Sequence, residues 1–248
     1  MELEQFWQRH PRAAIAFSGG VDSAYLLYSA VKAGVQVKAY YAKTFFQPQF
    51  EWDDARKLAA QLGADMEVLT LDILSVPHVA ENPQNRGYYC KQALFTAITQ
   101  KALADGFALL LDGTNASDEV TDRPGMKALE ELSVRSPLRE CGLTKAEIRR
   151  RSKEAGLFTA DKPAYACLAT RIPTGEEITP EKLRRTEDAE GFLRKLGLRD
   201  FRVRLRDDAA LIQVTREDLQ TVLDNREKII SRLKQDYQSV MLDMEVRP

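Results

Sequence analysis

The sequence AIAFSGGVDSAYLLYSAV, Ala14–Val31, joins an apolar run to a helical pattern through a short polar loop. The residues up to Phe17 are typical of a strand buried in a parallel sheet. Beyond the loop, apolar and aromatic residues recur at helical spacing until Gly34. Ligands bind at the carboxyl ends of strands in open α/β sheets. The stretch therefore predicts a strand and a helix joined by a ligand-binding loop, Ser18–Ser23.

The same alternation continues through the first two thirds of the chain. Further strands are predicted at 35–42, 66–71 and 107–112, and helices at 51–62, in the later part of 87–104 and at 144–155. Strands separated by helices form right-handed βαβ units. The sequence therefore predicts an α/β fold with a doubly wound parallel sheet.

A turn-rich stretch with three prolines, residues 161–182, interrupts this pattern. After it, strands are predicted at 201–205, 210–214 and 239–246, and helices at 180–196 and 216–233. The first two of these strands alternate apolar and polar residues and are expected to form a hairpin. We therefore expect two domains, residues 1–160 and a smaller α+β domain of residues 161–248.

The composition argues against several classes of protein. The three cysteines, Cys90, Cys141 and Cys167, are widely spaced and odd in number, which is untypical of a disulfide framework or a zinc ribbon. With only two histidines, a histidine metal site or a Ser-His-Asp triad is not expected. The net charge is −1, so any positively charged binding site has to be local. The charged N-terminus and the lack of an apolar run long enough for a bilayer predict a cytoplasmic protein without membrane contact.

The residue types of the loop suit a phosphate group. Gly19 and Gly20 let a ligand approach the backbone, Ser18 and Ser23 offer hydroxyls, and the helix that follows offers free N–H groups. Asp22 supplies the carboxylate oxygens that Mg²⁺ prefers. The loop lacks the GxxxxGK[ST] pattern of a Walker A motif. A glycine-rich turn that merely caps a helix is the simpler alternative, but the complete SGGVDS pattern favours nucleotide phosphate binding.

SGGVDS resembles the PP-loop of the ATP pyrophosphatase superfamily, whose members split ATP into AMP and pyrophosphate and adenylylate an acceptor oxygen. This resemblance implies the PP-loop type of α/β fold and ATP with Mg²⁺ as cofactors. The acceptor has to be inferred from other parts of the chain.

A second polar turn follows the strand predicted at 107–112, in the stretch LLLDGTNASDEVTDRPG. Gly113, Thr114 and Asn115 suit nucleotide contact, and Asp118 is a second candidate ligand for Mg²⁺. The GTN and DRPG patterns match the same superfamily, and this match implies that Arg123 faces the phosphates or the substrate. A solvated acidic loop is the alternative for each single residue.

Cys167 lies in the proline-bounded stretch PAYACLATR, four residues before Arg171. A thiol near a guanidinium ionises more easily, and the thiolate is the nucleophile. The alternative is a small buried apolar residue, the usual fate of a free cysteine. PAYACLATRIPTGEEIT, together with DGTN, DRPG, SPLRE and GLTKAEIR, resembles the LarE-type ATP-dependent sacrificial sulfur transferases, which act in making the nickel-pincer nucleotide cofactor of lactate racemase.

That resemblance implies a sequence of reactions. A carboxylate of pyridinium-3,5-biscarboxylic acid mononucleotide, a small nucleotide substrate, is adenylylated, and the Cys167 thiolate displaces AMP to form a thioester. Elimination then leaves a thiocarboxylate on the substrate and dehydroalanine at Cys167, so that the protein turns over once. Glu190 and Arg202 match the family's essential carboxylate and arginine, and Glu190 is a candidate for removing the Cα proton. The family further implies a homo-oligomer.

Some relatives hold an iron–sulfur cluster on three cysteines. Gly87 stands where the first cysteine of their upstream pair is found, so the resemblance implies no iron–sulfur cluster in this chain. The segment from Lys182 to Arg206 contains nine basic and four acidic residues. An arginine row there suits a substrate phosphate, although a solvated helix face and strand edge explain it as well.

Three other functions remain open on the sequence. A PP-loop tRNA thiolation enzyme would use aromatic side chains to stack bases, and the modest aromatic content gives no reason to expect a nucleic-acid partner. An ammonia-dependent adenylating ligase of the NAD synthetase kind would give Cys167 no role. A nucleotide-binding module without catalysis would bind ATP and release no pyrophosphate.

Overall fold

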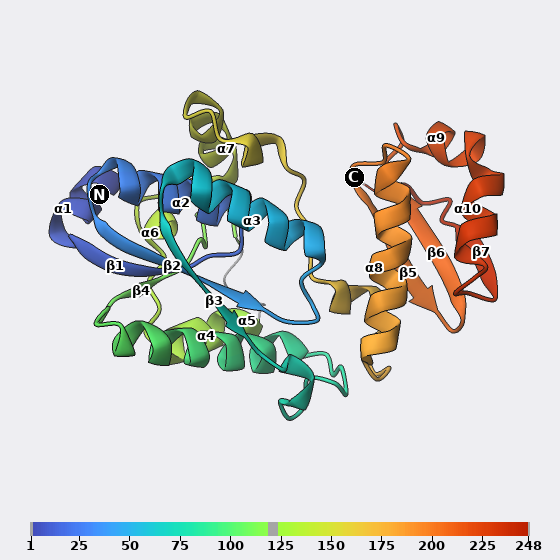
Figure 1. Ribbon diagram of the computed structural model, residues 1–248, viewed down its shortest axis with the longest axis horizontal. Coiled ribbons are helices and arrows are strands. Elements are labelled where there is room, and N and C mark those ends of the chain that lie inside the picture. The colour runs from blue at the N-terminus through green and yellow to red at the C-terminus, as the bar shows by residue number, and fades with distance from the viewer. Residues whose placement is uncertain (1, 119–123, 248) are drawn as a thin grey trace. The chain divides into compact units, whose positions relative to one another are not determined.

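The computed structural model describes residues 2–118 and 124–247 (Figure 1). The chain packs as two units. Unit 1 consists of Met1–Pro77 and Asn85–Ala164, and unit 2 of His78–Gln84 and Tyr165–Pro248. The sequence-based boundary followed residue 160, whereas the chain passes to unit 2 after Ala164. The short excursion of residues 78–84 to unit 2 has no counterpart in the expected domains.

Unit 1 contains the parallel sheet that the strand–helix alternation predicts. Its strand order is β3-β2-β1-β4, and every neighbouring pair is parallel. The strands are β1 (Arg12–Ala16), β2 (Gln36–Lys43), β3 (Asp65–Thr70) and β4 (Leu110–Leu111). The predicted α/β class with a doubly wound sheet is confirmed.

Both faces of the sheet are covered by helices. Figure 1 shows α2 (Val21–Lys32), α3 (Gln49–Leu62) and α7 (Lys145–Glu154) on one side and α4 (Arg86–Ala104) with α5 (Pro124–Glu131) on the other. The side chains of β1 alternate accordingly: those of Ala13 and Ile15 join the core around α2, and that of Ala14 joins the core around α4. Burial on both faces explains why this strand reads as a continuous apolar run. The shorter helices are α1 (Leu3–Arg9) and α6 (Pro137–Glu140).

The fourth strand is shorter than its apolar sequence suggests. The predicted strand of residues 107–112 pairs as β4 over Leu110–Leu111 only. Its first residue closes the end of α4 instead, because the N–H of Phe107 donates to the carbonyl of Ala102 at 2.8 Å. Apolar residues are found both in buried strands and in the turn after a helix, so the sequence pattern does not distinguish the two structures.

Unit 2 is built on a three-stranded sheet. Strands β5 (Phe201–Arg206) and β6 (Ala209–Val214) form the predicted antiparallel hairpin, and β7 (Ser239–Leu242) pairs with β6 in parallel. Its helices are α8 (Pro180–Lys195), α9 (Leu219–Asp224) and α10 (Arg226–Leu233). The single helix predicted at 216–233 is wrong: Asn225 ends α9 and begins α10, and its side chain donates to the carbonyl of Thr221 at 2.9 Å.

Unit 2 also contains the 3₁₀ helix η3 (Leu168–Arg171), and unit 1 contains η1 (Ile73–Ser75) and η2 (Phe158–Asp161). Among the described residues, no helix combines the length and the apolar character that crossing a membrane requires.

Candidate active site

The loop Ser18–Ser23 connects β1 to the first turn of α2. Gly19 has a φ of 72°, and a Cβ at this position would lie 2.9 Å from Cβ of Ala55, so only glycine fits. The hydroxyls of Ser18 and Ser23 lie 3.1 Å apart, and Ser23 Oγ also donates to the carbonyl of Gly20 at 3.2 Å. Gly20, the N-cap of α2, leaves the first N–H groups of this helix without a side-chain cap. Those free groups suit an anion.

The turn after β4 meets this loop at the carboxyl edge of the sheet. A Cβ on Gly113 would lie 2.8 Å from the backbone nitrogen of Ser23, so the two turns touch through backbone atoms. A pocket of about 230 Å³ lies here. Its lining comes from Ser18, Gly20, Asp22 and Ser23, from Asp112, Gly113, Thr114 and Asp118, and from Lys91 and Phe95 of α4.

Two of the residues predicted to contact the nucleotide do not line this pocket, and a third lies outside the described residues. Asn115 is 2% exposed, does not line the pocket, and accepts a hydrogen bond from the backbone N–H of Ser117 at 2.8 Å. Gly19 shapes the loop by its close approach to α3 and does not line the pocket either. Arg123 lies outside the described residues. The structure thus brings most, but not all, of the predicted nucleotide-binding residues together.

Asp22 is a carboxylate of this pocket whose pKa is shifted. Its Oδ2 accepts a hydrogen bond from Lys145 Nζ at 2.5 Å, whereas its Oδ1 is buried and has no hydrogen-bond partner among residues 2–118 and 124–247. Burial raises the pKa of the Asp22 carboxyl, against the opposing effect of Lys145. The sequence motif GLTKAEIR contains Lys145, but a residue 123 positions from Asp22 gives no local signal of this pairing.

The donor set fits a magnesium ion. Asp22 offers a buried carboxylate oxygen to which no described residue donates, and Asp118 lines the same pocket while its Oδ2 accepts from the N–H of Asn115 at 3.0 Å. Over residues 2–118 and 124–247, no group of three or more histidine, cysteine, aspartate or glutamate side chains could hold a metal by itself. Mg²⁺ bound by one or two carboxylates keeps several waters and takes phosphate oxygens as further ligands.

The contact between the two turns predicts a strong effect of Gly113→Ala. Because the new Cβ would collide with the backbone of Ser23, we expect the turns to separate and the affinity for ATP to fall about tenfold or more. Calorimetric titration with ATP measures this. Gly191→Ala on α8 is the matched control, since a Cβ there meets open space. If Gly113→Ala bound ATP as tightly as the wild type, the backbone contact between the two turns would not matter for ATP binding.

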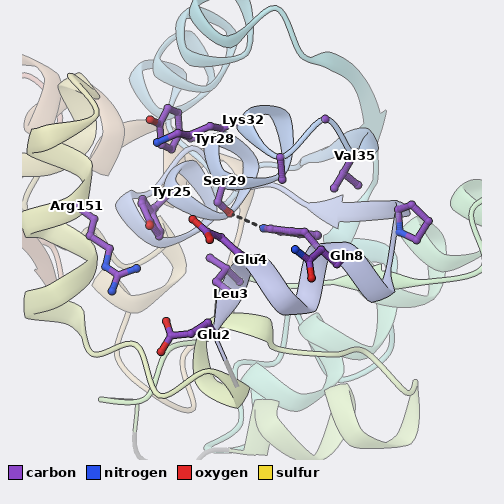
Figure 2. Close-up of a pocket in the computed structure, with 14 residues that line it drawn as sticks. Glu2, Leu3, Glu4, Gln8, Tyr25, Tyr28, Ser29, Lys32, Val35 and Arg151 are labelled. Carbon is purple, nitrogen blue, oxygen red and sulfur yellow. Dashed lines mark hydrogen bonds between the residues drawn. The ribbon is translucent and has the colours of Figure 1, made fainter.

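A larger pocket of about 580 Å³ lies between α1 and α2 in unit 1 (Figure 2). None of the predicted site residues lines it. Trp7, which borders it, donates through Nε1 to Ser29 Oγ at 3.1 Å. Size alone does not identify a catalytic site, and the convergent phosphate-binding and carboxylate groups favour the smaller pocket as the nucleotide site.

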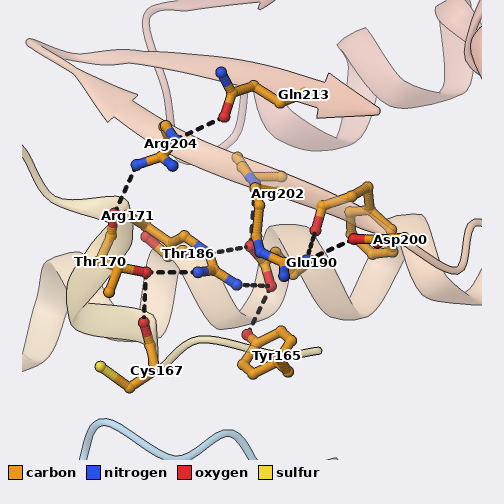
Figure 3. Close-up of polar contacts among 12 residues, drawn as sticks. Tyr165, Cys167, Thr170, Arg171, Thr186, Glu190, Asp200, Arg202, Arg204 and Gln213 are labelled. Carbon is orange, nitrogen blue, oxygen red and sulfur yellow. Dashed lines mark hydrogen bonds and ion pairs between the residues drawn. The ribbon is translucent and has the colours of Figure 1, made fainter. Parts of the chain in front are cut away.

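The residues predicted around the cysteine form a separate cluster within unit 2 (Figure 3). Cys167 is the N-cap of η3 and is partly exposed. Its carbonyl accepts two hydrogen bonds from Thr170, one from the backbone N–H at 3.0 Å and one from Oγ1 at 2.8 Å. The thiol-bearing residue is therefore held by its backbone and remains partly exposed.

A buried ion pair supports this loop. Glu190 of α8 is 1% exposed and Arg171 is 2% exposed. Arg171 Nε donates to Glu190 Oε1 at 2.7 Å, and its Nη1 donates to Thr170 Oγ1 at 2.7 Å. A chain of hydrogen bonds thus runs from Glu190 through Arg171 and Thr170 to the carbonyl of Cys167.

The Glu190 carboxylate receives four donors. Besides Arg171 Nε, these are Arg171 Nη2 at 3.3 Å, the hydroxyl of Tyr165 at 2.7 Å and the backbone N–H of Val203 at 3.0 Å. Two ionised oxygens offer about four lone-pair sites, and all of them are used. This geometry favours a positioning role for Glu190, and the hypothesis that it removes the Cα proton stays a prediction.

Arginine side chains surround the ring of Tyr165. The guanidinium carbons of Arg171, Arg202 and Arg194 lie 4.7, 5.3 and 6.0 Å from its centroid. Burial is the main reason that the pKa of Tyr165 is raised, and the Glu190 charge adds to it. Tyr165 is not among the predicted site residues, although its place two residues before Cys167 is a usable signal.

The cationic groups of this network differ in their surroundings. Burial alone would lower the pKa of Arg171, but the Glu190 hydrogen bond and charge raise it overall. The pKa of Arg202 is lowered, first by burial and then by the positive charges of Arg171 and Arg247. Arg204 donates through Nη1 to the carbonyl of Thr170 at 2.9 Å. These arginine side chains lie close together although their positive charges repel one another. Such an arrangement suits an anionic group of a ligand.

Comparison of the sequence with known proteins adds independent information. No protein-family model matches the chain. An uncharacterized protein of Synechocystis is 38% identical over 251 residues, covering 98% of this chain and 92% of the relative. Pyridinium-3,5-bisthiocarboxylic acid mononucleotide synthase of Lactiplantibacillus plantarum is 33% identical over 236 residues, covering 94% and 86%. The tRNA-specific 2-thiouridylase of a Thermotoga species is 26% identical and matches 61% of this chain and 54% of its own length.

Proposed function

Because the chain belongs to the LarE family of pyridinium-3,5-bisthiocarboxylic acid mononucleotide synthases within the PP-loop superfamily, we propose that it is an ATP-dependent sulfur transferase that uses Cys167 as the sulfur donor. The observation that carries the proposal is the support of Cys167 in unit 2. Its backbone is tied through Thr170 to a fully buried arginine–glutamate pair, while the residue stays partly exposed.

The proposed first step is adenylylation of the acceptor. A carboxylate of pyridinium-3,5-biscarboxylic acid mononucleotide attacks the α-phosphorus of ATP, and pyrophosphate leaves. Ser18, Ser23 and the free N–H groups at the start of α2 would hold the phosphates. Asp22 and Asp118 would hold Mg²⁺, which neutralises phosphate charge when bound. Lys145 Nζ donates to Asp22, and its positive charge balances the negative charge of this carboxylate.

The second step transfers the acyl group to the cysteine. The Cys167 thiolate attacks the activated carbonyl carbon, a C–S bond forms, and AMP leaves with the electron pair of the C–O bond. Arg171 lies close enough to Cys167 for its positive charge to interact with the thiolate that attacks. Arg202 and Arg204 provide positive charge for anionic groups of the substrate.

The third step releases the sulfur. A base removes the Cα proton of Cys167, the Cα–Cβ double bond forms, and the Cβ–S bond breaks with its electron pair on sulfur. The substrate leaves as a thiocarboxylate and the chain retains dehydroalanine. We further propose that the enzyme has no iron–sulfur cluster and turns over once, since Gly87 replaces a cysteine of cluster-containing relatives. Iron in the protein after purification without oxygen would overturn this proposal.

We also propose that the protein is a homo-oligomer. A monomer in analytical sedimentation would overturn this second proposal.

Pyrophosphate release with different acceptors separates this proposal from its alternatives. We expect release with the biscarboxylic mononucleotide and none with tRNA transcripts or with ammonia and nicotinate adenine dinucleotide. Cys167→Ser should still release pyrophosphate in a first turnover, because adenylylation precedes the cysteine step. Release that depends on tRNA or on ammonia would favour the thiolation or the amidation reading. No release with any acceptor would favour a binding module.

A further inference from the structure

Arg86 is the first residue of α4 in unit 1. The helix leads from the carboxyl end of β3 to the start of β4, and both strands are parallel in one sheet. Its N-terminus therefore lies at the carboxyl edge of the sheet, the edge that carries the nucleotide pocket. Lys91 and Phe95 of the same helix line that pocket, whereas Arg86 does not.

The guanidinium of Arg86 is buried in part, although the residue as a whole is partly exposed. Its Nε and Nη1 are buried, and neither has a hydrogen-bond partner in the part of the chain that the structure describes. Its Cζ lies 5.6 Å from the ring centroid of Phe46, which is 1% exposed and follows β2. A buried donor without an acceptor is costly, and in a native structure it calls for an explanation.

The start of α4 contributes no negative charge of its own. The first turn of α4 contains no acidic residue, and its N-cap Asn85 makes no side-chain cap. A permanently charged guanidinium, unused N–H groups at the start of a 19-residue helix and an aromatic platform therefore converge at this point. This combination is complementary to an oxyanion.

We propose that Arg86 binds an oxyanion of the acceptor substrate, either its second carboxylate or its phosphate. The proposal rests on the proposed function for the identity of the acceptor. It assigns Arg86 to acceptor recognition and leaves ATP to the pocket that Lys91 and Asp22 line. A desolvated arginine discriminates between acceptors because it remains unpaired when the anionic group is missing.

The chain offers a matched control for this arginine. The guanidinium of Arg56 on α3 also lies 5.6 Å from an aromatic centroid, that of Trp52, but Arg56 is exposed. Arg86→Met and Arg56→Met therefore remove the same charge from the same kind of ring contact. Only Arg86→Met removes buried donors.

The test is calorimetric titration of the full chain with pyridine-3,5-dicarboxylate, inorganic phosphate and ATP in turn. For Arg86→Met we expect the affinity of one anionic probe to fall about tenfold to a hundredfold. Arg86→Lys should recover part of the loss, Arg56→Met should behave as wild type, and ATP affinity should stay within about twofold throughout. A loss confined to the dicarboxylate assigns the carboxylate, and a loss confined to phosphate assigns the phosphate. Arg86→Met should also not lower the melting temperature, since it removes an uncompensated buried charge.

Several results would overturn the proposal. These are unchanged binding of both anionic probes, no binding of either probe by the wild type, a parallel loss of ATP affinity, or a change of oligomeric state in Arg86→Met that makes a second copy the partner of the arginine. The titration does not depend on sulfur transfer. Failure of the proposed function would therefore appear as absent pyrophosphate release, and failure of this inference as unchanged probe binding.

Discussion

Glu190→Ala should destabilise unit 2 by about 3–5 kcal/mol, because it leaves the Arg171 guanidinium buried without its counter-charge. Tyr165 and the N–H of Val203 lose an acceptor at the same time. Both tryptophans, Trp7 and Trp52, belong to unit 1, so their fluorescence does not report on unit 2. Hydrogen exchange of α8 and β5, followed together with urea unfolding by circular dichroism, measures the effect where it arises.

Two substitutions calibrate this result. Asp188→Ala removes another carboxylate of α8, whose 3.6 Å pair with Arg184 is solvent-exposed, and should cost less than about 1 kcal/mol. Tyr165→Phe retains the ring between the arginines but removes one of the four donors to Glu190, and should cost about 1–2 kcal/mol. If Glu190→Ala were as stable as Asp188→Ala, the buried network would not support the Cys167 loop.

Asp22→Asn should lower pyrophosphate release by about a hundredfold or more. The amide keeps the size of the side chain but removes the charge that would hold Mg²⁺, and electrostatic stabilisation by a bound metal ion lowers a barrier by several kcal/mol. Stability should not fall with activity. A carboxyl whose pKa is raised in the folded state favours folding at low pH, and this contribution is lost as the pH rises through the raised value. At neutral pH, asparagine therefore removes a buried charge that opposes folding.

The measurement is the rate of pyrophosphate release in a single turnover with saturating ATP, together with a thermal melt. Asp65→Asn, an exposed carboxylate at the start of β3, is the control and should retain full activity. Release by Asp22→Asn at the wild-type rate would remove Asp22 from the phosphate site. A lower melting temperature in proportion to the lost activity would instead assign Asp22 a structural role.

The local patterns in the sequence predict unit 1 well. β1 and α2 lie within a residue of their expected bounds, because an apolar run, two glycines and a helical repeat are all local signals. The excursion of residues 78–84 is not local. It depends on Asn82, whose side chain donates to the carbonyl of Pro173 at 2.8 Å, and on the N–H of Ile178, which donates to Ala80. Contacts over some ninety residues leave no periodic trace in the sequence.

The candidate site divides in the same way. Ser18, Asp22 and Gly113 are recognisable because each follows a predicted strand, and parallel strands end at one edge. The partners of the site are not recognisable, since Lys145 reaches Asp22 from a distant helix and Tyr165 reaches Glu190 from the cysteine loop. The sequence therefore predicts which residues carry the chemistry, whereas packing decides which residues hold them in place.

The measurement that tests the central proposal most directly is the intact mass of the full chain before and after incubation with ATP, Mg²⁺ and pyridinium-3,5-biscarboxylic acid mononucleotide. We predict the loss of one hydrogen sulfide per chain, located at Cys167 by peptide mapping and absent in Cys167→Ala. An unchanged mass with continued formation of AMP would contradict the account, because the sulfur would then not come from Cys167.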